Sequence, residues 1–99
     1  MNHKQRLLNL LGLAQRAGKI VSGEELVTKE IQLSKAQLVF VACDTGKNTL
    51  KKIKDKSTYY QIPCCDLLST MELTNALGKP RKVVAVMDPG FAKKMGELI

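Results

Sequence analysis

Two apolar runs constrain the fold of this chain more than any other feature of its sequence. Residues 38–43 are apolar throughout, and residues 82–87 become apolar after their first lysine. Runs of this kind without polar alternation are typical of strands covered on both faces. The sequence therefore predicts two central strands that lie between two layers of helices.

Apolar residues at helical spacing surround these two runs. We expect helices at residues 7–17, 24–33, 47–59, 69–77 and 89–98, and shorter strands at residues 19–21 and 62–65. Helices and strands alternate through all 99 residues, with no internal repeat and no linker. This order predicts an α/β fold, a three-layer α/β/α sandwich with a small mixed, largely parallel sheet of about four strands. We expect residues 1–99 to form one domain.

Several residues mark the ends of these elements. Gly18 is placed to end the first helix. Ser22 and Glu25 have the spacing of a capping box, which would start the second helix. Pro63 cannot donate a backbone hydrogen bond, so it favours the start of a strand or an edge strand.

The charge balance points to a polyanionic partner. Sixteen Lys and Arg against nine Asp and Glu give a net charge of +7. RNA or DNA is the first candidate for a chain this basic. The chain has only two Tyr and two Phe and no Trp, so we expect no binding surface built on stacked aromatic rings.

Other compositional features exclude several classes of protein. The apolar stretch near the N-terminus is interrupted by Asn9 and Gly12, which argues against a secretory signal, and no apolar window is long enough to span a membrane. The cysteines are Cys43, Cys64 and Cys65, an odd number with two adjacent, which favours a reducing cytoplasm over a disulfide framework. Adjacent strand residues point to opposite faces, so this pair is not expected to hold a metal. We expect no cofactor.

Two stretches suggest an enzyme motif, but the rest of the sequence supports neither. Asp44-Thr45-Gly46 matches the tripeptide of aspartic proteases, but that fold is nearly all strand, whereas this chain predicts five helices. A phosphate-binding loop ending at Gly46-Lys47 would need glycine at position 41 and a hydroxyl at position 48, where the chain has Val and Asn. Asp44 and Asp88 follow strands, and we interpret both as turn or cap residues.

The lysines of residues 47–56 are interpreted as a solvated helix face. A better candidate for a specific phosphate contact is the start of the second helix, where free amides and the helix dipole favour anions. Gly23 lies there, and a glycine lets a phosphate backbone approach closely.

The stretch of residues 17–29, together with residues 36–42, 62–63, 73–78 and 83–86, resembles the kink-turn-binding ribosomal proteins typified by L7Ae and L30e. Residues 10–17 and 88–92 are most similar to the small bacterial YlxQ-like branch of that superfamily. The resemblance covers nearly the whole chain. It implies a three-layer α/β/α protein that binds a kink-turn or similar internal loop of structured RNA, without catalysis.

The resemblance also assigns positions. The family motif G-x-N-E-x-x-K, which meets sheared G·A pairs, maps to Gly23, Glu25, Leu26 and Lys29. Leu26 makes no hydrogen bond where the family has glutamate, and Glu25 either accepts from a guanine edge or serves the capping box. The loop after the third strand is implied to close over an extruded nucleotide. The expected RNA-binding residues are Lys19, Ser22, Gly23, Glu24, Glu25, Thr28, Lys29, Leu67, Leu68 and Ser69.

The leading hypothesis is a cytoplasmic, monomeric, ribosome- or RNA-associated protein. A protein-interaction module on the same fold is the alternative, because an exposed Leu26 beside charged residues would suit a protein contact. An enzyme acting on a small ligand rests only on Asp44 and Asp88.

Overall fold

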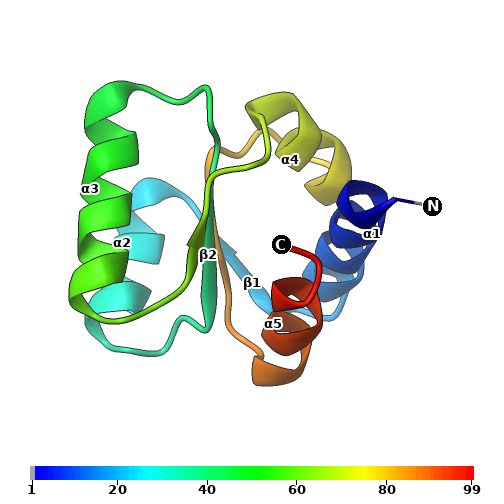
Figure 1. Ribbon diagram of the computed structural model, residues 1–99, viewed down its shortest axis with the longest axis horizontal. Coiled ribbons are helices and arrows are strands. Elements are labelled where there is room, and N and C mark those ends of the chain that lie inside the picture. The colour runs from blue at the N-terminus through cyan, green and yellow to red at the C-terminus, as the bar shows by residue number, and fades with distance from the viewer. Residues whose placement is uncertain (1) are drawn as a thin grey trace.

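The computed structural model describes residues 2–99, and its elements alternate as the sequence predicts (Figure 1). In chain order they are α1 (His3–Arg16), β1 (Ile20–Ser22), α2 (Glu24–Gln32), β2 (Leu38–Val41), α3 (Lys47–Tyr59), β3 (Cys64–Cys65), α4 (Thr70–Leu77), β4 (Val83–Val86) and α5 (Pro89–Gly96). The two apolar runs form β2 and β4, and every residue of both strands is buried. Within the described residues, no helix has the length and apolar character needed to cross a membrane.

The four strands lie in the order β1-β4-β2-β3. β4 is antiparallel to both β1 and β2, and β3 is parallel to β2. Three strands therefore run in one direction, but β4 is inserted between two of them. The mixed four-stranded sheet is confirmed, while the expectation of largely parallel pairing is wrong, because two of the three pairings are antiparallel.

Helices cover both faces of this sheet (Figure 1). On one face α1, α4 and α5 enclose a core that includes Leu11, Phe40 and Met95. On the other face α2 and α3 enclose a second core that includes Val27 and Ile53. These two cores confirm the three-layer α/β/α sandwich.

The adjacent cysteines divide between the two cores. Cys65 belongs to the core under α1, α4 and α5, and Cys64 packs against the core under α2 and α3. Their separation confirms that neighbouring strand residues point to opposite faces. β3 is also the edge strand that Pro63 favoured.

The start of α2 differs from the prediction. Ser22 is the last residue of β1, where it pairs with Val84, and Gly23 is the N-cap without a side-chain hydrogen bond. The capping box predicted for Ser22 and Glu25 is therefore wrong, because strand pairing holds Ser22 outside the helix.

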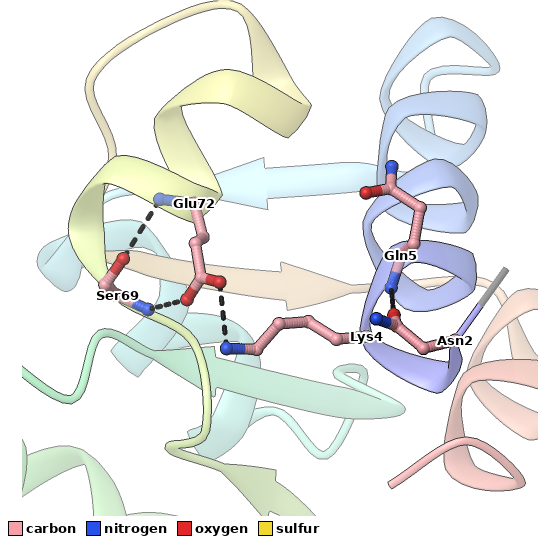
Figure 2. A network of polar contacts seen from close by, with 5 residues as sticks. All are labelled: Asn2, Lys4, Gln5, Ser69 and Glu72. Carbon is pink, nitrogen blue, oxygen red and sulfur yellow. Dashed lines mark hydrogen bonds and ion pairs between the residues drawn. The ribbon is translucent and has the colours of Figure 1, made fainter.

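A capping box does occur at α4. The Ser69 hydroxyl accepts from the Glu72 amide at 3.1 Å, and the Glu72 carboxylate accepts from the Ser69 amide at 2.9 Å. Figure 2 shows that Glu72 also faces Lys4 of α1, with 2.9 Å between the Lys4 Nζ and Glu72 Oε2 atoms. The same residues that start α4 thus tie it to α1.

The strand directions bring four connections to one edge of the sheet. β1, β2 and β3 end at this edge, and β4 begins there. The start of α2, the β2–α3 turn, the β3–α4 loop and the α4–β4 loop therefore lie along it. We call this end of the sheet, where β1, β2 and β3 finish and β4 begins, the loop edge; it is distinct from the outer strands β1 and β3.

Candidate functional site

An open hollow of about 440 Å³ lies on the loop edge. It is lined by residues 22–24, 45–46, 49 and 80–83. These residues come from the start of α2, the start of α3 and the α4–β4 loop, which are distant in sequence. The strand order explains the meeting, because β4 lies between the strands that precede α2 and α3.

Two helix N-termini face this hollow. α2 and α3 both follow strands that run toward the loop edge, so both helices start there and run back along the sheet. Their N-caps are Gly23 and Gly46, neither of which covers the first amides with a side chain. The first amides of a helix lack intrahelical partners, and the dipole makes this end positive. Together the two ends favour an anion.

Gly23 has a backbone conformation that requires glycine. Its φ is +101°, and an added Cβ would meet nothing within 4 Å. The requirement is therefore conformational, not a matter of space. The Gly23 amide itself donates to the Val83 carbonyl at 2.9 Å, which fixes the turn against β4.

The α4–β4 loop supplies positive charge to the same hollow. Lys82 is exposed and Arg81 is half-buried, and both line the wall. The Lys82 carbonyl accepts from the Ala42 amide at 2.8 Å, so the loop backbone is held beside β2. Sequence reasoning missed these residues. The run Lys79-Pro80-Arg81-Lys82 before a buried strand was the available signal.

Glu24 is the one acidic residue in the wall, and it is bonded to α3. Its carboxylate accepts from the Thr49 hydroxyl at 2.8 Å and pairs with Lys52 at 3.2 Å. The Thr49 hydrogen bond, followed by that of Lys52, lowers the pKa of Glu24. Its negative charge is thus directed to α3 and partly neutralised there.

The remaining predicted residues of α2 lie on two different faces. Glu25, Leu26 and Lys29 are exposed and adjoin one another at helical spacing, so they form one outward stripe next to the hollow. The Thr28 hydroxyl donates to the Glu24 carbonyl at 2.7 Å and is partly buried. Lys29 is therefore available to a ligand, and the Thr28 hydroxyl is occupied within the helix.

The β3–α4 loop separates the predicted leucines. Leu67 is 59% exposed, but Leu68 is 1% exposed and belongs to the core under α1 and α4. The expectation that Leu68 binds RNA does not fit this structure, because its buried side chain has no access to a ligand. Ser69 is occupied as the N-cap of α4. The β3–α4 loop does not itself line the hollow. It lies next to the β2–α3 turn, which does, because the Leu68 carbonyl accepts from the Cys43 amide at 2.9 Å.

Lys19 lies away from the other predicted residues. It precedes β1, and its carbonyl accepts from the Met87 amide at 2.9 Å. That position is at the edge of the sheet opposite to the loop edge. The structure therefore does not bring Lys19 together with Gly23.

The two aspartates that follow strands have structural partners. Asp44 Oδ1 accepts from the Thr70 amide at 2.9 Å and from the Thr70 hydroxyl at 2.7 Å, and these bonds lower the pKa of Asp44. Asp88 caps α5 by accepting from the Phe91 amide. Both confirm the turn and cap interpretation. Within residues 2–99, the structure contains no group of three His, Cys, Asp or Glu side chains that could hold a metal.

Comparison with known proteins places the chain in a family. The model of the ribosomal protein L7Ae/L30e/S12e/Gadd45 family matches residues 5–96. The chain belongs to this family. The family resemblance seen in residues 17–29 is thereby confirmed over nearly the whole sequence.

Curated relatives of this L7Ae-family chain are bacterial. It is 55% identical over 97 residues to the RNA-binding protein YlxQ of Enterococcus faecium, covering 98% of this chain and 94% of the relative. It is 50% identical over 91 residues to the RNA-binding protein YlxQ of Bacillus subtilis (strain 168), covering 91% of each chain.

Solved structures share the fold. A protein of unknown function from Bacillus halodurans superposes with a TM-score of 0.89 at 42% identity, covering 93% of this chain and 94% of the other. The Giardia lamblia 15.5kD RNA binding protein superposes with a TM-score of 0.82 at 20% identity, covering 98% of this chain and 90% of the other. The second likeness, at this low identity, shows the fold alone.

Proposed function

We propose that this protein binds structured RNA, of the kink-turn or similar internal-loop type, without catalysing a reaction. The observation that carries the proposal is the hollow on the loop edge, where two helix N-termini meet Arg81 and Lys82. Two relatives at 50% and 55% identity that are named RNA-binding proteins support it. The net charge of +7 supplies a general attraction for RNA.

The contacts divide by their chemistry. The free amides after Gly23 and Gly46 bind phosphate oxygens, and Arg81, Lys82 and Lys29 neutralise backbone charge. Leu26 packs against sugar or an unpaired base. These contacts read a kinked backbone more than base identity. Bulges and internal loops also offer splayed nucleotides, which a regular duplex does not.

The proposal also covers the cellular location and the oligomeric state of the protein. We place it in the cytoplasm as a monomer that associates with ribosomal or other structured RNA. All three cysteines are free thiols, which suits a reducing compartment.

Binding of a kink-turn RNA and of a straight duplex of equal length, measured across a salt titration, tests the proposal. We expect the kink-turn to bind more tightly. Arg81→Ala, Lys82→Ala and Lys29→Ala should each weaken binding, and each should reduce the salt slope by about one unit.

Lys93→Ala is the matched control, because Lys93 is exposed on α5 at the opposite face of the sheet. Lys19→Ala tests how far the binding surface extends. Lys19 lies at the far end of β1 from the hollow, so this variant should bind RNA as the wild type does. Equal affinity for kink-turn and duplex would contradict kink-turn recognition. Unchanged affinity in all three loop-edge variants would contradict the proposed surface.

A protein-interaction module is the second candidate, and one observation favours it. Leu26 is 57% exposed at the position where the family motif has glutamate, beside the charged Glu25 and Lys29. Capture of partners from cells with and without ribonuclease discriminates the two functions. Partners that remain after ribonuclease and are lost with Leu26→Asp would favour the protein contact.

A further inference from the structure

Tyr59 at the end of α3 is the most exposed of the large hydrophobic residues. Its side chain is 80% exposed, in a chain with only two Tyr, two Phe and no Trp. The Tyr59 and Tyr60 ring centroids are 4.9 Å apart at 74°, so the two rings meet edge to face. Tyr60 also packs against the core under α2 and α3. The inner ring therefore braces the outer one, which stays open to a ligand.

The surroundings of Tyr59 form a recess. An open hollow of about 450 Å³ is lined by Asp55, Lys56, Tyr59 and Tyr60. The hollow is shallow and open, so it suits a ligand that lies on the surface and is not enclosed. An exposed aromatic ring beside a cationic side chain is the arrangement that binds an unpaired base and its phosphate.

The helix that carries Tyr59 is strongly positive. α3 contains five lysines and one acidic residue, Asp55. Lys52 pairs with Glu24 and Lys54 pairs with Asp66, but Lys47, Lys51 and Lys56 have no ion-pair partner among residues 2–99. Lys47 and Lys56 are nine residues apart and so lie on opposite sides of the helix. Of these three lysines, Lys56 is therefore the one beside Tyr59, three residues before it.

Tyr59 lies at the far end of α3 from the loop-edge hollow. Tyr59 is thirteen residues after the N-cap Gly46, a distance of about 20 Å along the helix. Lys52 lies between them, two turns before Tyr59 on the same side of the helix. An RNA strand that leaves the loop edge along α3 would therefore pass Lys52 and Lys56 before it reaches Tyr59.

We propose that Tyr59 and Lys56 form a second RNA contact, in which the Tyr59 ring stacks on an unpaired base and Lys56 meets the adjoining phosphate. The inference rests on the proposed function for the class of ligand, but not for the site. Asp55 also lines this recess, and its carboxylate repels phosphate. The RNA strand therefore passes on the side of α3 that carries Lys56 and Lys52.

An unstructured oligouridylate of about eight nucleotides tests this contact without any kink-turn. We expect the wild-type protein to bind it in low salt, with quenching of tyrosine emission. Tyr59→Ala should weaken binding about fivefold or more, whereas Tyr59→Phe should keep it within about twofold, because stacking needs the ring and not the hydroxyl. Lys56→Ala should weaken binding, and Asp55→Asn should strengthen it by removing the opposing charge.

Leu13→Ala is the control, since Leu13 is 48% exposed on α1 in the other helical layer. Circular dichroism verifies that each variant folds. No binding of the oligouridylate by wild type, or equal binding by Tyr59→Ala, would overturn the inference.

The same variants on a blunt-ended kink-turn RNA separate the two proposals. Tyr59→Ala should leave that affinity unchanged, and Lys29→Ala should lower it. A wild-type protein that binds oligouridylate in a Tyr59-dependent way but does not bind the kink-turn RNA would reject the proposed function and support the second contact.

Discussion

Glu24 at the start of α2 accepts a hydrogen bond from the Thr49 hydroxyl of α3 at 2.8 Å. The bond joins the first turns of the two helices whose N-termini face the loop-edge hollow. Lys52, one turn further along α3, pairs with the other carboxylate oxygen at 3.2 Å. The spacing of the two N-termini is therefore set partly by one carboxylate, which also belongs to the one acidic residue in the wall of the hollow.

The first prediction concerns stability at low pH. Hydrogen bonds lower the pKa of Glu24, Asp44, Asp66 and Glu72 in the folded protein. Their unfolded pKa values lie near 4, so the unfolded state takes up protons more readily as the pH falls. The stabilisation is fully present above about pH 5 and is lost as the pH falls through the lower folded values.

Urea unfolding between pH 7 and pH 3 measures this loss. Thr49→Val should flatten the pH dependence, because it removes the largest cause of the Glu24 shift. A wild-type free energy of unfolding that stays constant from neutral to acidic pH would contradict the hydrogen bonds assigned to these carboxylates.

The second prediction concerns RNA affinity. Glu24→Gln removes a negative charge from the wall of the hollow, while its amide oxygen still accepts from Thr49. We expect tighter RNA binding by a few-fold and a smaller effect at high salt, where charges are screened. Glu30→Gln on the same helix is the control, because residue 30 does not line the hollow. Weaker binding by Glu24→Gln, measured by fluorescence anisotropy, would show that the carboxylate is itself a contact.

Much of the fold could be predicted because the buried strands and helices differ strongly in hydrophobic pattern. The helix predicted from Lys47 to about Tyr59 is α3, and β3 lies at the edge of the sheet, one of the two positions that Pro63 favoured. Strand order was not predictable in the same way. Nothing in the apolar run of β4 reports that it is inserted between β1 and β2, since a fully buried strand has the same pattern whichever way it runs.

The candidate site was only partly predictable. The start of α2 could be identified from Gly23 and its neighbours, because a local motif carries the signal. Arg81 and Lys82 join that site through the position of β4, and no local pattern records a contact across about 60 residues of chain. Ser22 was misassigned as a cap because a serine before glutamates satisfies the capping pattern equally well at the end of a strand.

The third prediction compares two adjacent leucines. Leu68 is 1% exposed within the core under α1 and α4, so Leu68→Ala should lower the free energy of unfolding by about 2–5 kcal/mol. Leu67 is 59% exposed, and Leu67→Ala should change it by less than about 0.5 kcal/mol. Chemical denaturation of the two variants decides the assignment. Equal losses would contradict the burial of Leu68 and the exposure of Leu67.

The last prediction concerns the contact of α1 with α4. A Cβ at Gly12 would lie 3.2 Å from the Ala76 carbonyl oxygen, whereas a Cβ at Gly96 in α5 meets nothing within 4 Å. Gly12→Val should destabilise the protein by about 1–3 kcal/mol, because a backbone atom of α4 must move to admit the side chain. Gly96→Val introduces the same residue into a helix with open space, and it should be neutral or stabilising by up to about 0.5 kcal/mol. Since intrinsic helix propensity favours valine over glycine at both positions, a loss at Gly12 alone isolates the steric cost of the close helix approach. Equal effects in urea denaturation would instead show that α4 yields freely and that the approach does not require glycine.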